Sequence, residues 1–136
     1  GGGSSTHKVI LNYGFFDSNV RNIFIPLTNE TETTSRQRYN VYVPTSAGEV
    51  TKFSLFLTGS KSGGTGGSVA VQKMTGATSY VTLDTATFSS VTGYVPQVLT
   101  FSGATFSAGD RIYFWVVNGF GSSWGNMMGS IEIELS

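Results

Sequence analysis

Short runs of alternating apolar and polar residues dominate the chain. The clearest run lies at the C-terminal end, where Ile131, Ile133 and Leu135 alternate with serine and glutamate. This is the pattern of a strand with one buried and one solvated face. Windows that keep a helical period without glycine, proline or clusters of β-branched residues are almost absent. The pattern therefore predicts a chain built from β-strands.

The same alternation predicts short strands along the rest of the chain. With the C-terminal strand (130–136), the stronger predictions cover residues 8–13, 22–27, 37–43, 49–58, 68–74, 98–102 and 110–117. Weaker candidates cover residues 80–83 and 88–91. Glycine-rich segments predict an exposed, mobile hairpin tip at 59–67 and a turn at 103–109. Together they predict an all-β fold, an antiparallel β-sandwich of jelly-roll-like topology with about eight strands.

Several aromatic residues fall on strand faces that the alternation assigns to solvent. They are Phe24, Tyr42, Phe56 and Trp115, with Tyr113 as the alternative to Trp115. One scattered exposed aromatic residue needs no explanation, but several on neighbouring strands form an apolar patch. We therefore predict a contact surface made by these residues, used most simply for self-association.

Length and cysteine content indicate one domain that is stabilised by packing. The chain has 136 residues, enough to bury a core of its own. Residues 8–136 are predicted to form a single β-sandwich domain, and the glycine- and serine-rich residues 1–7 a flexible N-terminal segment. No cysteine is present, so the domain is stabilised without disulfides or thiolate metal sites.

The charge balance narrows the class of partner. Eight Lys and Arg residues offset eight Asp and Glu residues, which removes the electrostatic attraction for nucleic acid and for anionic membranes. No apolar run reaches the length of a membrane span. Only 12% of the residues are charged, which indicates that much of the surface lies against neighbours. Protein partners are therefore expected, without nucleic acid or membrane insertion.

The short motifs do not assemble a catalytic site. Residues 121–125 match G-x-S-x-G, but no helical pattern follows Ser123, and only His7 is available as its base. Glu30 and Glu32 lie in a polar loop without apolar neighbours that would raise the pKa of a carboxyl for glycoside hydrolysis. We therefore predict that the chain is not an enzyme, with a hydrolase that uses Ser123 and His7 as the rival hypothesis.

No metal or cofactor is expected either. The carboxylates and the one histidine do not have the spacing of a metal-binding loop. Residues 63–67 are rich in glycine but lack the Lys-Ser or Lys-Thr pair of a phosphate-binding loop. A calcium ion held by oxygens from distant loops is the alternative that this pattern leaves open.

Three aromatic residues in glycine-containing loops suggest another kind of binding. Tyr94, Phe120 and Trp124 each lie next to or near a glycine outside the predicted strands. Aromatic rings presented in this way stack on the faces of sugars. A stand-alone carbohydrate-binding module is therefore the alternative function.

The order of several motifs resembles a known class of domain. Residues 24–43 (FIPLTNETETTSRQRYNVYV), 50–57 and 101–118 (FSGATFSAGDRIYFWVVN) contain an I-P-L opening strand and a run of Glu, Thr and Ser. A proline-containing turn follows at Pro44, and F-S-A-G-D at 106–110 precedes a strand. This order resembles β-sandwich domains of tailed-bacteriophage virion proteins, above all those of marine phages. A more distant similarity is to the C1q and tumour-necrosis-factor jelly rolls, in which a G-D pair also leads into a late core strand.

The resemblance implies a structural role at the surface of a virus particle. Such domains are decoration proteins, head fibres or tail-fibre tips, often trimers, that bind a host glycan or the capsid lattice. For this chain it implies a homo-oligomer at the virion surface, assembled in the host cytoplasm, with other virion proteins and a host glycan as further partners. No family residue with a chemical role maps onto this sequence, so no site is transferred.

Overall fold

Every regular element of the structure is a β-strand. The computed structural model describes residues 6–16, 23–27, 41–58, 64–65, 67–77, 79–118 and 126–136. The strands are β1 (His7–Phe16), β2 (Ile23–Phe24), β3 (Gly48–Leu57), β4 (Gly64–Thr65), β5 (Ser68–Met74), β6 (Tyr80–Thr87), β7 (Ser90–Val91), β8 (Gln97–Thr100), β9 (Thr105–Phe106), β10 (Arg111–Asn118) and β11 (Asn126–Leu135). In the described part of the chain, no helix has the length and hydrophobicity that a membrane span requires.

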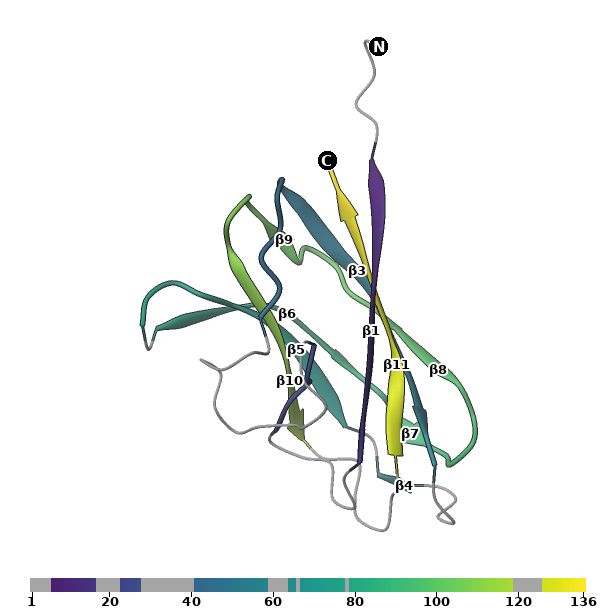
Figure 1. The fold of residues 1–136 in the computed structure, drawn as a ribbon. Coiled ribbons are helices and arrows are strands. Elements are labelled where there is room, and N and C mark those ends of the chain that lie inside the picture. The colour runs from purple at the N-terminus through teal and green to yellow at the C-terminus, as the bar shows by residue number, and fades with distance from the viewer. Residues whose placement is uncertain are drawn as a thin grey trace.

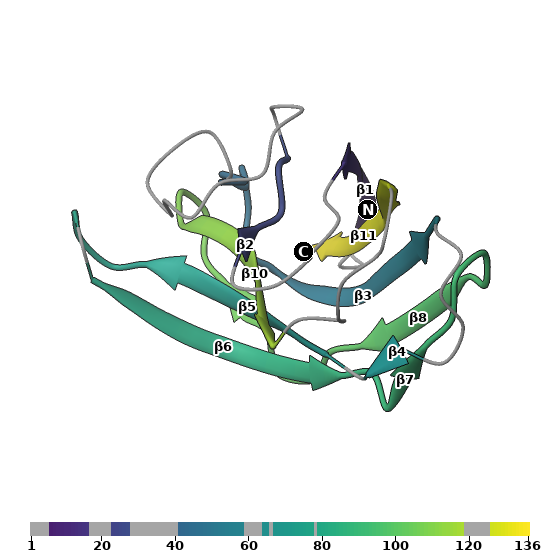
Figure 2. The ribbon, with the colours of Figure 1, turned by 90° about the horizontal axis from the view of Figure 1, so that it is seen from below.

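The strands form two antiparallel sheets that face each other (Figures 1 and 2). Sheet I has the order β1-β11-β3-β8, with β9 also paired to β3, and sheet II has the order β2-β10-β5-β6. The short strands β4 and β7 form a separate pair. The chain's first and last strands lie side by side in sheet I, and the chain passes repeatedly from one sheet to the other. This order is that of a jelly roll, which confirms the predicted fold.

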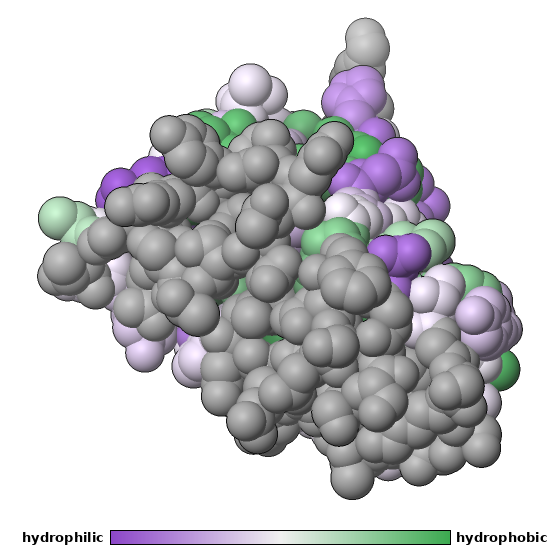
Figure 3. Space-filling view, turned by 60° about the horizontal axis from the view of Figure 1, so that its bottom comes forward, coloured by the Kyte–Doolittle hydropathy of each residue, from purple (hydrophilic) through white to green (hydrophobic). Residues whose placement is uncertain are grey.

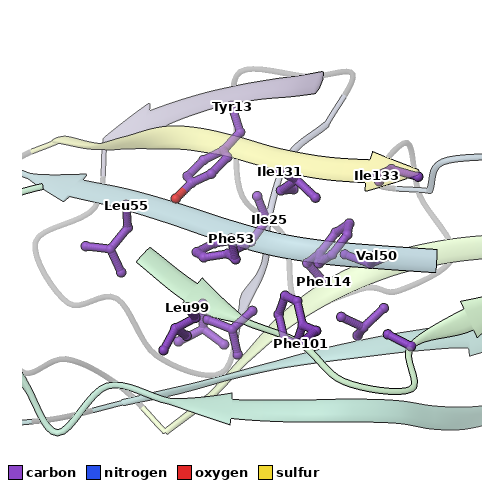
Figure 4. Close-up of a cluster of buried hydrophobic side chains, with 14 of the residues drawn as sticks. Tyr13, Ile25, Val50, Phe53, Leu55, Leu99, Phe101, Phe114, Ile131 and Ile133 are labelled. Carbon is purple, nitrogen blue, oxygen red and sulfur yellow. The ribbon is translucent and has the colours of Figure 1, made fainter. Parts of the chain in front are cut away.

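The core fills the space between the sheets (Figure 4). Apolar side chains on alternate positions of β3, β10 and β11 point into it, as the sequence pattern predicts. The ring of Tyr13 stacks on Phe53 with 5.3 Å between the ring centroids, and its hydroxyl donates to the carbonyl oxygen of Ser54 at 2.7 Å. Burial raises the pKa of Tyr13 well above its ordinary value, so the hydroxyl stays protonated as a donor.

Most predicted strands are present, several with different bounds. Residues 68–74 have the predicted bounds, whereas the strand predicted at 8–13 extends from His7 to Phe16. The weak candidate at 80–83 is the start of an eight-residue strand, β6, and the predicted turn at 103–109 contains the short strand β9. His7, which was assigned to the N-terminal segment, begins β1, and residues 1–5 lie outside the described residues.

The strand predicted at 37–43 is not borne out in its described part. Residues 37–40 lie outside that part, and residues 41–43 form only an isolated bridge between Tyr42 and Ile112. The faces are also reversed, because Tyr42 packs against the main core while Val43 is exposed. The proline at 44 has no N–H to continue a ladder, so the pairing ends there, and a one-residue change of register exchanges the two faces.

The glycine-rich segment at 59–67 also differs from the prediction of an exposed tip. Residues 59–63 and 66 lie outside the described residues. Residues 64–65 are strand β4, which pairs with β7, and Gly67 is buried. The carbonyl oxygen of Gly67 accepts a hydrogen bond from the Phe88 N–H at 2.8 Å, so the end of this segment is part of the folded sandwich.

Candidate functional site

The four predicted contact residues do not form one patch. Phe24 and Trp115 are paired across β2 and β10 in sheet II, whereas Phe56 lies on β3 in sheet I. Tyr42 is half-buried against the core between the sheets. The prediction that these four residues form one contact surface is therefore wrong, although Phe24 and Trp115 do lie together.

The outer face of sheet II is a second, small core. Phe24 is only 3% exposed, and its ring meets Tyr113 edge-on at 5.3 Å and stacks on Trp115 at 5.9 Å. Met74 completes this cluster, and Val41 packs against it. Phe24 and Tyr113 are thus buried rather than solvated, and Trp115 is half-buried, which corrects the expectation of an open aromatic patch on this sheet.

The outer face of sheet I presents an exposed aromatic ring, that of Tyr94. This side chain is 63% exposed, although its ring rests edge-on against Phe56 at 6.0 Å between centroids. The Tyr94 N–H donates to the carbonyl oxygen of Leu57, the last residue of β3, at 2.8 Å. The ring is therefore fixed to the end of β3 by one backbone bond and one ring contact.

The backbone of Tyr94 has an unfavourable conformation. Its φ is +63°, and it is the only non-glycine residue with a positive φ in the described part of the chain. A left-handed conformation costs a residue with a Cβ about 1–2 kcal/mol. Strain of this kind persists where the surrounding structure enforces it, and it is concentrated at functional sites.

Two further apolar side chains adjoin this ring pair. Met128 is directly opposite Phe56 in the β3–β11 ladder, and Val98 is opposite Ser54, two residues from Phe56 on the same face. Val98 is 61% exposed and Met128 is also exposed. We call Phe56, Tyr94, Val98 and Met128 the Tyr94 surface. It is an open apolar area on the outer face of sheet I.

The opposite end of the same face is charged. Lys8 Nζ lies 3.3 Å from Glu132 Oε1, and the Thr51 hydroxyl donates to Glu132 Oε2 at 2.9 Å. The hydrogen bond from Thr51, followed by the contact with Lys8, holds the pKa of Glu132 below its ordinary value. The outer face of sheet I therefore has charged side chains at the end where β1 begins and β11 ends, and aromatic side chains at the other end.

An open cavity of about 300 Å³ lies beside the charged end. It is lined by Thr6, Ala47, Gly48, Glu49, Thr105, Phe106, Glu134 and Ser136. Glu49 and Glu134 are direct neighbours in the β3–β11 ladder. Among the described residues, no three His, Asp or Glu side chains gather in a way that could hold a metal ion. Two adjacent carboxylates alone define no reaction, so we assign none to this cavity.

The sequence-predicted ligand-stacking residues are only partly described. Tyr94 is exposed, as expected, whereas Phe120 and Trp124 lie outside the described residues. So do Ser123 of the G-x-S-x-G match and both Glu30 and Glu32. The sequence placed Tyr94 and Phe56 in different predicted sites, and the structure brings their rings together. Val98 and Met128 were not singled out, although alternation around the buried Leu99 places Val98 on the solvated face.

Comparison with known proteins identified no relative. No protein-family model, no curated protein and no solved structure matches the chain. The candidate site therefore rests on the geometry of the Tyr94 surface.

Proposed function

We propose that the chain is a virion structural protein of a tailed bacteriophage, displayed on the capsid or tail as a decoration or fibre domain. In this proposal it forms a homo-oligomer, a trimer as in the domains it resembles, and the Tyr94 surface contacts a neighbouring virion protein. The observation that carries the proposal is the ring of Tyr94, which is exposed on a strained backbone above Phe56.

The fold is compatible with this role. Jelly rolls are the architecture of many viral capsid and lectin domains, although a fold alone does not define a function. Two motifs on which the resemblance rests, the turn at Pro44 and F-S-A-G-D at 106–110, are in contact. The Gly109 N–H donates to the carbonyl oxygen of Pro44 at 2.9 Å. The Ser107 N–H donates to Asp110 Oδ2 at 2.8 Å, which closes the tight turn before β10.

The chemistry of the Tyr94 surface favours a protein partner. The cores of protein interfaces are enriched in aromatic residues and methionine and poor in charge. Phe56, Tyr94 and Met128 match this composition, and the charged side chains of sheet I lie at its other end. Tyrosine is also one of the residues that most often dominate binding energy.

Particle composition and a pair of variants test the proposal. We expect gradient-purified particles of the phage that encodes the chain to contain it. We also expect antibody against the domain to label the surface of these particles. We expect Tyr94→Ala to weaken binding of the purified domain to particles that lack it by about 30-fold, the effect of removing an interface hot spot. Tyr80→Ala is the matched control, because Tyr80 is another exposed tyrosine but lies on sheet II.

Two results would count against the proposal. Absence of the chain from purified particles, by mass spectrometry and by labelling, would exclude the virion role. Equal binding of Tyr94→Ala and Tyr80→Ala would exclude the Tyr94 surface as the contact.

A stand-alone carbohydrate-binding module is the second candidate, and the same exposed ring favours it. An accessible tyrosine on a rigid support stacks on a sugar face as readily as on a protein. A glycan array with the wild type, Tyr94→Ala and Tyr80→Ala separates the two functions. Glycan binding that only Tyr94→Ala abolishes, together with no association with virions, would favour this candidate over the first.

A further inference from the structure

β1 is a long strand with one open edge. It pairs with β11 along all ten of its residues without a register shift. Within the part of the chain that the structure describes, β11 is the only strand that pairs with it. The other edge of β1 therefore presents backbone N–H and C=O groups that a further strand can pair with.

The other edge strands of the two sheets are short or irregular. β2 has only two residues, and Pro26 lies two positions after its end. β8 has four residues and is directly preceded by Pro96. β6 is longer, but its ladder with β5 contains a register shift between Val71 and Gln72. Shortness, proline and bulges are the devices that keep sheet edges from pairing with other chains. β1 has none of them.

The one charged residue of β1 does not guard its edge. A lysine on an edge strand usually extends into solvent and prevents another strand from approaching. The Lys8 side chain is 61% exposed, but it is directed toward the inner neighbour β11, where its Nζ lies 3.3 Å from Glu132 Oε1. In Figure 3, hydrophilic (purple) and hydrophobic (green) side chains lie next to each other at the upper right of the view.

The apolar side chains of β1 are incompletely covered near its middle. Tyr13 and Phe15 are buried, but Val9 and Leu11 on the same face are only half-buried against the core. On the opposite face, Ile10 is 51% exposed. The incompletely covered apolar side chains of β1 are therefore the three consecutive residues Val9, Ile10 and Leu11, on both faces of the strand.

We propose that β1 pairs with β1 of a second copy of this chain, antiparallel and with the two-fold axis at Ile10. Side chains directly opposite in an antiparallel pair lie on the same face, and this register satisfies that condition throughout. It places Ile10 opposite Ile10 of the second copy, Val9 opposite Leu11, and Lys8 opposite Asn12. No like charges meet, and the half-covered residues cover one another.

This pairing joins sheet I of both copies into one continuous sheet. The contact is closed and two-fold, because the same edge is used by both partners. It does not involve the Tyr94 surface and is independent of the proposed virion role. The three-fold assembly of the proposed function uses another surface.

Sedimentation of the wild type and two lysine variants tests the pairing. We expect the wild type to pair with rising concentration, doubling the mass of the species present at low concentration. This pairing is at least tenfold weakened in Ile10→Lys, because the axis places the two lysines against each other. Val81→Lys, at a similarly exposed apolar position on β6 of sheet II, keeps the wild-type equilibrium. The thermal transition of each variant establishes that it is folded. A wild type that is monomeric at its highest soluble concentration, or an Ile10→Lys variant that associates like the wild type, would overturn the proposal.

Single cysteines test the register, since the chain has no cysteine of its own. Cα atoms of directly opposite residues are about 4.5–5.5 Å apart, within the range of a disulfide. We expect Ile10→Cys to form a disulfide-linked dimer on mild oxidation, and Asn12→Cys, which faces Lys8, to remain uncrosslinked. Crosslinking of Asn12→Cys as fast as Ile10→Cys, or of neither, would contradict the axis at Ile10.

Discussion

The outer faces of the two sheets each carry an aromatic cluster, but the cluster around Phe24 on sheet II is buried and the one around Tyr94 on sheet I is open. On sheet II, Phe24 and Tyr113 are buried. Phe24 meets Tyr113 edge-on and stacks on Trp115, and Val41 packs against this cluster. On sheet I, Phe56 has Tyr94 as its aromatic neighbour, and the ring of Tyr94 remains exposed. The contrast shows that alternation decides which face a side chain lies on. Whether that face is covered depends on chain segments outside the strand.

The largest expected effect is a difference in the stability lost when a ring is removed from each of these two faces. Phe24→Ala removes a buried ring from its contacts with Tyr113 and Trp115 and should lower the free energy of unfolding by about 3–5 kcal/mol. Phe56→Ala removes a half-buried ring and should cost about 1 kcal/mol. Urea denaturation of both variants measures the difference. Equal losses would mean that the cluster on sheet II contributes no more than the open surface on sheet I.

A second prediction concerns how tightly sheet I is built beneath its open face. A Cβ at Gly129 would collide with the carbonyl oxygen of Ser54 and lie 2.8 Å from the hydroxyl of Tyr13. At Gly14, on the adjacent strand, the nearest atom would be at an ordinary 3.8 Å. We expect Gly129→Ala to destabilise the domain by about 1–3 kcal/mol, as overpacking does, and Gly14→Ala to have little effect.

Thermal denaturation of the two alanine variants checks this prediction. A Gly129→Ala variant as stable as Gly14→Ala would show that β3 and β11 separate easily. The Tyr94 surface would then lack the rigid support that its strained residue requires.

The sequence predicted the positions that strands occupy better than the surroundings of their side chains. The bounds of β5 and the buried face of β3 follow directly from alternation and turn residues. The burial of Phe24 was not predictable, because periodicity contains no information on which distant segment covers a face. The reversal at Tyr42 arises from a single bridge before Pro44, where one residue of register decides the face.

The site was partly predictable for a similar reason. The sequence identified Tyr94 as an exposed aromatic residue and Phe56 as a residue on a solvated face. Their contact depends on the positive φ of Tyr94 and on its backbone bond to Leu57, which no hydrophobic pattern indicates. A tyrosine directly after glycine, as in Gly93-Tyr94, is the one local signal for a turn at this point.

A smaller effect distinguishes strain from packing at Tyr94. Tyr94→Gly removes the left-handed strain, about 1–2 kcal/mol, and the ring contact with Phe56, about 0.5–1.5 kcal/mol, so the two changes nearly cancel. Tyr94→Ala loses the contact but keeps a Cβ, so it should be less stable than Tyr94→Gly by about 1 kcal/mol. Chemical denaturation compares the variants. A glycine variant less stable than the alanine variant would mean that the backbone there is unstrained.

The smallest effect contrasts the two ends of sheet I. The pKa of Glu132 in the folded protein is held below its ordinary value of 4.5, first by the Thr51 hydroxyl and then by Lys8. A carboxyl with a lowered folded pKa stabilises the fold above its ordinary pKa, and this contribution is lost as the pH falls through the folded pKa. Thr51→Val should therefore raise the pKa of Glu132, as followed by carboxyl NMR signals in a pH titration.

Lys8→Met is the control for that titration, because the Lys8 side chain is largely exposed and its charge is screened by salt. Its effect on the pKa of Glu132 should be smaller than that of Thr51→Val and should vanish at high ionic strength, whereas the effect of Thr51→Val persists. Binding through the Tyr94 surface should be unchanged in both variants, because the ionic and aromatic ends are separate. A larger shift from Lys8→Met than from Thr51→Val would assign the lowered pKa to charge instead of the hydrogen bond.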